Sequence, residues 1–340
     1  MTREDDRTQR CDVLVLGSGG AGLTAALTAA AGGLETIVAE KANKFGGTTA
    51  LSAAGLWVPA NRCAREAGIS DSSDEAFNYI RSLAPPGWPR TDEDLWRRFV
   101  IEAPRMLEFV EAHSPLRFEL TPQSDPYADQ PGAKLHGRMI SPRPLRRKIL
   151  GGHSGKLRRP MLPHIFAYQE ALQRDPYHRP LSASVSLLPR VMWRLLTGSR
   201  GMGTALVVGL LKGCIEHGCR FELRARALEL FTDERGRVCG AMLRQDGREL
   251  RILARHGVVL ATGGFEWDAA LLGKYFPGPI DFITSPPGNE GDGHRMALRV
   301  GAQLAHMDQA NIGPALPVLY EGRLQGMRYF FHHEPNAIIV

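Results

Sequence analysis

Residues 12–40 read DVLVLGSGGAGLTAALTAAAGGLETIVAE. Asp12–Leu16 is an apolar run with β-branched residues, which is typical of a buried parallel strand. It leads into a glycine-rich turn and then into small apolar residues up to Ala31, a pattern that predicts a helix. A second apolar run, Thr36–Ala39, ends in Glu40. The order strand, glycine turn, helix and strand predicts an α/β protein with a Rossmann-like unit and a parallel sheet.

The glycine turn has the spacing that lets a dinucleotide pyrophosphate approach the backbone. Gly17 permits the tight turn, Gly19 permits the close approach, and Gly22 lets the helix and the strand pack together. The first N–H groups of the helix face an anion, and the Glu40 carboxylate is expected to accept hydrogen bonds from an adenosine ribose. The predicted dinucleotide-binding residues are Gly17, Gly19, Gly20, Ala21, Gly22 and Glu40. A glycine-rich turn in an unrelated α/β protein is the alternative.

The composition is that of a folded globular protein. The chain has 340 residues, of which 43% are hydrophobic and 23% are charged, and this excludes a disordered chain. Its five cysteines form no Cys-x-x-Cys pair, so neither a disulfide framework nor a zinc site is supported. The net charge of +6 comes from scattered basic residues with few aromatics between them, which does not favour nucleic-acid binding. The polar N-terminus does not resemble a signal peptide, so a cytoplasmic location is expected.

Two stretches concentrate basic residues. Residues 138–159 hold eight lysines and arginines, residues 176–215 hold five, and neither stretch contains an acidic residue. The second stretch includes SVSLLPRVMWRLL at 184–196, which predicts a helix lying on the surface, with Pro189 expected to interrupt it. Peripheral contact with a membrane or another anionic partner is one interpretation. A solvated basic surface is the other.

The sequence after the second strand decides between NAD and FAD. Residues 41–56 read KANKFGGTTALSAAGL. This resembles the E-K-x-x-x-x-G-G-T-T-x-x-S segment of the flavoprotein family that contains fumarate reductase flavoprotein subunits and 3-ketosteroid dehydrogenases, in which the segment wraps the flavin half of FAD. The resemblance implies FAD as the cofactor, with contacts from Lys41, Gly46, Gly47, Thr48, Thr49 and Ser52.

A second part of this resemblance lies at 257–265, GVVLATGGF. In the family this strand returns to the nucleotide-binding sheet, which implies cofactor contacts from Thr262, Gly263 and Gly264. Residues 221–247 are expected to form strands and turns, with a hairpin turn at 233–236, and the resemblance places adenine near Ala227. Residues 288–293, GNEGDG, precede a predicted helix over 294–300, where Asp292 either contacts the flavin or serves only as the N-cap.

One short segment indicates the branch of the family. Residues 306–316 read HMDQANIGPAL, whereas the corresponding segment of the fumarate reductase branch ends in His-Pro-Thr and uses the histidine to bind a substrate carboxylate. A buried dicarboxylate needs such a partner, so Gly313-Pro314-Ala315 favours the 3-ketosteroid dehydrogenases. No histidine lies between Glu40 and Trp57, where respiratory members attach FAD covalently. FAD is therefore expected to be noncovalent.

The resemblance also implies catalytic tyrosines, because 3-ketosteroid dehydrogenases pass a hydride from ring A to the flavin while a tyrosine removes the neighbouring proton. Tyr127, in DPYADQPG at 125–132, matches a supporting tyrosine. Tyr329, ahead of PNAIIV at 335–340, is the candidate base, and Tyr320 competes with it. A core or surface tyrosine is the alternative for each. His332 and His333 are adjacent on a predicted strand and point to opposite faces, so no metal site is expected.

The resemblance covers residues 11–340. It implies an FAD-binding domain over residues 1–293, with a large insertion over about 59–200, and a partial α+β substrate-cap domain over 294–340. Relatives continue beyond this point, so the chain is expected to be C-terminally truncated. The expected activity is dehydrogenation of a 3-ketosteroid or similar apolar cyclic ketone, with an unidentified electron acceptor. A fumarate-reductase-like flavoprotein acting on an unsaturated acid and a truncated, noncatalytic FAD-binding protein are the alternatives.

Overall fold

The computed structural model of the protein describes residues 7–174, 179–276 and 278–328, and the chain forms two compact units. The first unit comprises Met1–Leu51, Lys156–Leu162 and His217–Val340, and the second comprises Ser52–Gly155 and Pro163–Glu216. The first unit is therefore assembled from three stretches of chain, with the second unit inserted between them. The predicted division into a domain over 1–293 and a partial cap domain over 294–340 stays a prediction.

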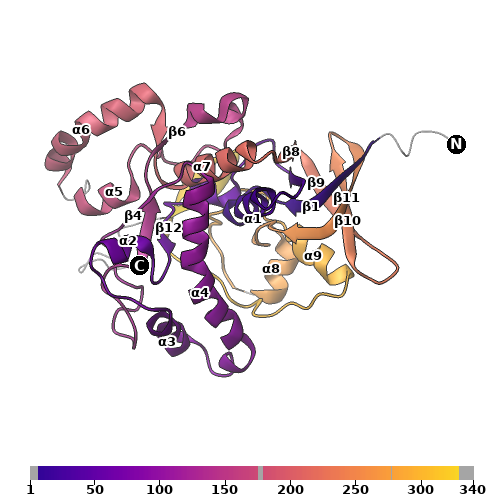
Figure 1. The fold of residues 1–340 in the computed structure, drawn as a ribbon, viewed down its shortest axis with the longest axis horizontal. Helices are drawn as coiled ribbons and strands as arrows, with labels where there is room; N and C mark the ends of the chain where they lie inside the picture. The colour runs from indigo at the N-terminus through magenta and orange to yellow at the C-terminus, as the bar shows by residue number, and fades with distance from the viewer. Residues whose placement is uncertain (1–6, 175–178, 277, 329–340) are drawn as a thin grey trace. The chain divides into compact units, whose positions relative to one another are not determined.

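A six-stranded sheet forms the core of the first unit (Figure 1). In spatial order the strands are β8 (Arg220–Leu223), β2 (Thr36–Glu40), β1 (Thr8–Leu16), β11 (Arg248–Leu260), β10 (Val238–Gln245) and β9 (Ala225–Thr232). The first four are parallel, and β10 and β9 continue the sheet in antiparallel pairing. The α/β class with a parallel sheet is confirmed. The carboxyl ends of parallel strands meet at one edge, which is where open α/β sheets bind their ligands.

The predicted strand, glycine turn, helix and strand are all present. The helix α1 (Gly20–Ala31) follows the turn, and Gly32 is its C-cap. β1 begins at Thr8 rather than at Asp12, because the residues before Asp12 pair in register with β11. Central strand residues such as Leu14 and Ile37 are fully buried, so the apolar runs that predict the strands also form the core.

Shorter elements complete the first unit. They are the 3₁₀ helix η2 (Gly47–Leu51), the helices α8 (Ala269–Tyr275) and α9 (Asp292–Arg299), and the hairpin strands β12 (Ala315–Tyr320) and β13 (Arg323–Arg328). The predicted turn between β9 and β10 is confirmed, because Gly236 N donates to Asp233 O at 2.9 Å. The α9 helix lies against β9 of the sheet.

The second unit is mainly helical. Its helices are α2 (Arg62–Glu66), α3 (Ser73–Leu83), α4 (Pro89–His113), α5 (Tyr168–Arg174), α6 (Pro180–Thr197) and α7 (Met202–Glu216). A small sheet has the order β3 (Leu56–Trp57), β5 (Met139–Pro142) and β4 (Phe118–Leu120), and β6 (Leu145–Arg146) pairs with β7 (Ser199–Arg200). The 3₁₀ segment η3 (Arg147–Lys156) leads back towards the first unit.

The helix α6 corrects one expectation. Pro189 lies inside it and does not interrupt it. A proline removes the hydrogen bond to the carbonyl four residues earlier, which here belongs to Val185, a residue on the exposed side of the helix. Within the described residues, no helix is long and apolar enough to cross a membrane.

Candidate functional site

The glycine turn between β1 and α1 is shaped by close backbone contacts. Gly17 has a φ of +109°, and an added Cβ would lie 2.2 Å from the carbonyl oxygen of Ala261, just after β11. An added Cβ at Gly22 would lie 2.0 Å from the carbonyl oxygen of Gly17. Both contacts are far below van der Waals distance, so only glycine fits at either position. The first and last glycines of the turn therefore have the packing roles that the sequence predicts.

Gly19 has a different environment. The nearest atom to an added Cβ there is the Thr49 hydroxyl oxygen, at 3.7 Å, so packing within the chain does not require a glycine. A ligand lying against the backbone would require one. The first turn of α1 carries no acidic residue, and the positive end of the helix dipole is therefore not neutralised from within the helix. The turn thus fits a pyrophosphate.

Glu40 anchors the turn to the end of β2. Its Oε2 accepts from Ser18 N at 3.0 Å and from Ser18 Oγ at 2.7 Å, and its Oε1 accepts from Ala42 N at 2.9 Å. The Ser18 hydroxyl in turn accepts from Gly46 N at 3.2 Å. Glu40 is 9% exposed. The carboxylate therefore organises the cofactor edge, and its predicted contact with a ribose stays a prediction.

The segment after β2 returns to the start of α1. Gly46 and Gly47 both have positive φ, and η2 then brings the Thr49 hydroxyl to Gly20 N, from which it accepts at 2.9 Å. The Thr48 hydroxyl accepts from Asn289 Nδ2 at 3.2 Å. The first contact brings together Gly20 and Thr49, which are both predicted cofactor residues. Ser52 belongs to the second unit.

The end of β11 packs against the loop before α9. An added Cβ at Gly263 would lie 2.5 Å from Asn289 Oδ1, and one at Gly293 would lie 2.2 Å from Thr262 Oγ1. Gly264 O accepts from Gly291 N at 3.0 Å. The carboxyl ends of β1, β2 and β11 thus meet at one edge, and each carries predicted cofactor residues.

An ion network closes this edge at α9. Asp292 accepts from Lys41 Nζ at 2.8 Å and from Arg226 Nη2 at 2.7 Å, and both cations also pair with Glu290. Burial opposes ionisation of Asp292 most strongly, but the hydrogen bonds from Lys41 and Arg226 outweigh it and lower its pKa. The expectation that Asp292 is an N-cap is wrong. Gly291 is the N-cap, and Asp292 is the first helical residue, so its carboxylate is used for the ion pairs instead.

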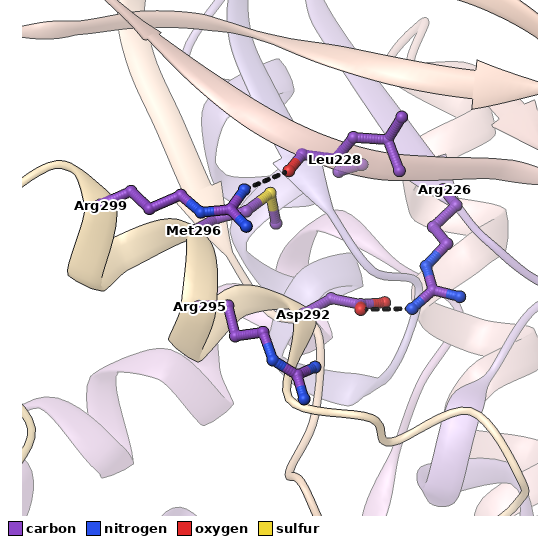
Figure 2. A pocket seen from close by; sticks show the side chains of 7 residues that line it. Arg226, Leu228, Asp292, Arg295, Met296 and Arg299 are labelled. Atoms are coloured by element: carbon purple, nitrogen blue, oxygen red, sulfur yellow. Dashed lines mark hydrogen bonds and ion pairs between the residues drawn. The ribbon is translucent and has the colours of Figure 1, made fainter. Parts of the chain in front are cut away.

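A pocket of about 280 Å³ lies between β9 and α9 (Figure 2). It is lined by Arg226, Ala227, Leu228, Asp292, Arg295, Met296 and Arg299. Ala227 and Asp292, which are 65 positions apart in sequence, therefore line the same pocket. Figure 2 shows the arginine side chains around it, with Arg226 reaching Asp292 and Arg299 reaching the Leu228 carbonyl.

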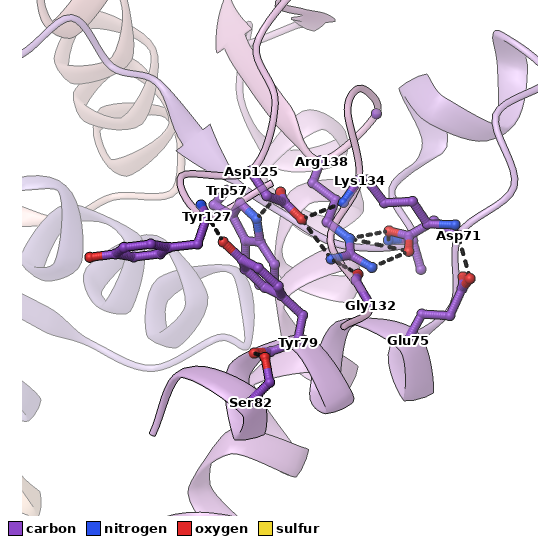
Figure 3. A network of polar contacts seen from close by, with 12 residues as sticks. Trp57, Asp71, Glu75, Tyr79, Ser82, Asp125, Tyr127, Gly132, Lys134 and Arg138 are labelled. Carbon is purple, nitrogen blue, oxygen red and sulfur yellow. Dashed lines mark hydrogen bonds and ion pairs between the residues drawn. The ribbon is translucent and has the colours of Figure 1, made fainter. Parts of the chain in front are cut away.

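Tyr127 belongs to the second unit, on a loop held by a buried arginine (Figure 3). Arg138 binds Asp71 through Nε and Nη2, at 3.0 and 2.7 Å, and donates from Nη1 to Asp125 at 2.8 Å and to the Gly132 carbonyl at 2.9 Å. The three charged side chains are at most 1% exposed. Asp125 and Gly132 flank Tyr127, so Arg138 holds both ends of its loop.

Two further contacts hold this loop. Trp57 Nε1 donates to Asp125 at 2.7 Å, and the backbone N–H of Tyr127 donates to the Tyr79 hydroxyl at 3.1 Å. Burial raises the pKa of Tyr79. The side chain of Tyr127 points away from the network, and the residue is 58% exposed. The loop is fixed in place while its tyrosine remains accessible.

The other candidate tyrosines differ. Tyr329 lies outside the described residues. Tyr320 ends β12, and its hydroxyl donates to the Arg159 carbonyl. Burial, followed by the nearby Glu321 carboxylate, raises the pKa of Tyr320 to about 12, which makes it a harder phenol to ionise. No cluster of metal ligands occurs among residues 7–174, 179–276 and 278–328.

Sequence reasoning missed Ser18, Asn289 and the pairing role of Glu290. Ser18 lies within the glycine turn, and its position next to Gly17 is the only local signal for it. Asn289 and Glu290 lie in the quoted GNEGDG segment, but each has a partner, Thr48 and Lys41 respectively, that is more than 240 positions away in the chain. No local pattern points to contacts of that range.

Comparison with known proteins agrees with this geometry. A family model described as an FAD binding domain matches residues 12–325. The chain is 36% identical over 354 residues to 3-oxosteroid 1-dehydrogenase of Mycolicibacterium smegmatis, covering 98% of this chain and 60% of that protein. It is 37% identical over 304 residues to 4-oxocyclohexanecarboxylate 2-dehydrogenase of Sinomonas cyclohexanicum, covering 86% of this chain and 50% of that protein.

The structure is similar to the crystal structure of 3-ketosteroid Δ1-dehydrogenase from Sterolibacterium denitrificans in complex with 1,4-androstadiene-3,17-dione. The TM-score is 0.83 at 30% sequence identity, and the match covers 94% of this chain and 59% of that chain. The chain therefore spans about 60% of the length of the relatives that it matches along nearly its whole length.

Proposed function

Because the chain belongs to the FAD-binding domain family, we propose that it is the flavin-binding part of a dehydrogenase that introduces a ring double bond into a 3-ketosteroid or similar cyclic ketone. The observation that carries the proposal is the meeting of three separate segments at the carboxyl ends of β1, β2 and β11, with a glycine at position 19 that packing within the chain does not require. The names of the three similar proteins described above, each a dehydrogenase of a ring ketone, support the reaction class.

The proposed residues for FAD come from several segments of the chain. The glycine turn and the start of α1 would bind the pyrophosphate, Glu40 the ribose, and Ala227 the adenine. Gly46, Gly47, Thr48, Thr49, Thr262, Gly263, Gly264, Lys41 and Asp292 would complete the edge, and Ser52, the residue after η2, would add a further contact. When bound, FAD supplies the acceptor for the hydride that leaves the substrate ring.

The protein's own residues would remove the proton from the substrate. Forming the ring double bond removes a hydride from one carbon and a proton from its neighbour, and we assign the proton to the phenolic oxygen of Tyr329. A phenol is a weak base at neutral pH unless its anion is stabilised. Tyr127, accessible on its fixed loop, is the proposed supporting residue.

The test uses the protein at the full length that its gene encodes, called the parent below, with FAD bound and an artificial electron acceptor. Two ketones are tested as substrates, a 3-ketosteroid and the single-ring compound 4-oxocyclohexanecarboxylate. Turnover of either one supports the proposal. Reoxidation of the reduced flavin by fumarate, without turnover of either ketone, overturns it in favour of a fumarate-reductase-like enzyme. Bound FAD with neither reaction overturns it in favour of a noncatalytic protein.

The proposal includes noncovalent FAD and peripheral contact with a membrane. Acid precipitation of the yellow protein should release the flavin into the supernatant, because no histidine lies between Glu40 and Trp57. Flavin that stays with the denatured polypeptide would contradict noncovalent binding. The membrane contact is supported by the exposed apolar side of α6.

A further inference from the structure

The helix α6 has two apolar sides. Its outward face, defined here as Leu181, Val185, Leu188, Met192, Leu195 and Leu196, consists of side chains that are 49% to 83% exposed. These positions recur every three or four residues, so at 100° per residue they lie on one side of the helix. Six adjacent exposed apolar residues form a continuous stripe, whereas single exposed ones are ordinary on a protein surface.

The opposite side of α6 is firmly packed. Ala183 and Leu187 are each 2% exposed. Arg194 donates to both carboxylate oxygens of Glu170 on α5, at 2.5 and 2.9 Å, and to the Ile165 carbonyl at 3.0 Å. Figure 1 shows α5 beside α6. The inner side of this helix therefore packs against the second unit, and its outward face is exposed.

Exposed cations lie near the two ends of the outward face. Arg179 precedes the helix, whereas Arg190 lies on the opposite side of the helix and pairs with Glu170 at 3.2 Å. At the C-terminal end, pairing of β6 with β7 brings Arg146 close, with its guanidinium 5.8 Å from the Trp193 ring centroid, and Lys148 follows on the same segment. Neither 138–155 nor 179–200 contains an acidic residue. The two ends of the face are thus basic.

We infer that the outward face of α6 docks on an anionic lipid bilayer, with the helix lying in the plane of the interface. An apolar stripe with flanking cations and a tryptophan at its edge fits the boundary between acyl chains and negatively charged headgroups. A second copy of the chain would bring the same cations against themselves, which costs electrostatic energy, so charge favours the bilayer. The inference rests on the membrane contact within the proposed function and is independent of the ketone chemistry.

The first test is co-sedimentation of the chain with lipid vesicles. Vesicles containing phosphatidylglycerol should bind it more tightly than vesicles of phosphatidylcholine alone, and added salt should weaken this binding. The triple variant Leu181→Ser, Leu188→Ser, Leu196→Ser should bind at least about tenfold more weakly, because each leucine loses the free energy of leaving water. Leu95→Ser is the matched control, since Leu95 is 63% exposed on α4, outside the face.

A second variant separates charge from apolar contact. Arg146→Glu combined with Lys148→Glu should abolish the preference for phosphatidylglycerol while leaving the stripe intact. Trp193 supplies an optical signal, because its fluorescence should shift to the blue on vesicles, and this shift should be missing in Trp193→Phe. The shift keeps the inference testable if the triple variant does not fold.

Three results would overturn the inference. The first is no binding to either type of vesicle. The second is a dimer in solution that the triple substitution dissociates, which would make a second copy the occupant. The third is vesicle binding by this chain but not by the parent, which would mean that a segment outside this chain covers the face. None of these results would alter ketone turnover by the parent, so the dehydrogenase proposal is judged separately.

Discussion

At the scale of single residues, the candidate site depends on two glycines that no larger residue can replace. Gly17 and Gly22 are required by backbone oxygens about 2 Å from where a Cβ would be. Ser18 and Glu40 are joined through two hydrogen bonds, which tie the turn to the end of β2. The sequence predicts the glycines from their spacing, whereas the Ser18 contact appears only in the structure.

We expect Gly17→Ala to destabilise the chain by about 2–5 kcal/mol, because it combines a left-handed φ with a clash against the Ala261 carbonyl. Gly33→Ala is the control, since Gly33 has a φ of +83° but no neighbour within 4 Å of an added Cβ. It should cost only the backbone strain, about 1–2 kcal/mol. Denaturant unfolding of both variants measures the difference between their free energies of unfolding. Equal losses of stability would mean that a backbone shift relieves the clash at Gly17.

Substitution of Glu40 tests its two roles. Glu40→Ala removes the predicted ribose contact together with the anchor on Ser18, and should weaken FAD binding by about 1.5–3 kcal/mol, the range for hydrogen bonds to charged groups. Ser18→Ala removes only the hydroxyl part of the anchor. Titration with FAD should show a clearly larger effect for Glu40→Ala. If Ser18→Ala weakens binding equally, Glu40 acts through the turn and not on the ribose.

His164 predicts a pH dependence of stability. Burial lowers its pKa from 6.5 to about 4, and its Nδ1 accepts from Thr204 N at 3.2 Å, which needs the neutral ring. In the unfolded chain His164 is protonated below about pH 6.5, whereas in the folded chain it is protonated only below about pH 4. The free energy of unfolding therefore decreases as the pH falls from 6.5 towards 4. Between pH 7 and 5 the loss should be about 2 kcal/mol.

The variant His164→Gln isolates the contribution of His164 to the pH dependence of stability. His164→Gln should lower stability at pH 7 but flatten the decline between pH 6.5 and 5, a range above the ordinary titration of carboxylates. Unfolding by denaturant at several pH values measures both curves. Parallel curves would show that other groups cause the decline.

At the scale of elements, the loop that carries Tyr127 is held by distant parts of the second unit. Arg138 follows the loop, Asp71 precedes α3, and Trp57 belongs to β3. Burial opposes ionisation of Asp71 most strongly, but hydrogen bonds led by those from Arg138 outweigh it and lower its pKa. The network is therefore a set of ionised groups that stabilise one another, and removal of one member leaves the others buried without a partner.

We expect Arg138→Met to destabilise the chain by about 3–5 kcal/mol, because two buried carboxylates lose their cation. Hydrogen exchange at the Tyr127 amide should become faster, since its loop loses both anchors. Arg105→Met is the control on α4, where the side chain is 70% exposed and pairs with the exposed Glu102. Arg105→Met should change the free energy of unfolding little. Unchanged exchange at Tyr127 in Arg138→Met would show that the loop is held without Arg138.

At the scale of the whole molecule, the first unit draws its cofactor edge from residues near positions 20, 50, 260 and 290. The intervening chain folds as the second unit and carries Tyr127. The chain spans about 60% of the length of the relatives that it matches along nearly its whole length. A complete catalytic site is therefore a property to test in the parent.

In that parent, Tyr329→Phe should lower turnover at least about 100-fold, the usual contribution of a positioned acid or base. Ketone binding and flavin content should be unchanged, because the ring that packs is retained. Tyr320→Phe is the control and should keep its turnover, since the Tyr320 hydroxyl is already bonded to the Arg159 carbonyl. Full activity of Tyr329→Phe combined with loss in Tyr320→Phe would reverse the assignment.

The sequence by itself determined the strand, turn, helix and strand of residues 12–40, the parallel sheet and the FAD family, because these depend on local spacing and on motifs of adjacent residues. Only the tertiary structure decided that Ser18 binds Glu40, that Asp292 pairs with Lys41 and Arg226, and that α6 continues through Pro189 with one apolar side outward. The physical reason is distance along the chain. A carboxylate binds whichever donors folding brings within about 3 Å, and no local pattern encodes a partner about 250 positions away.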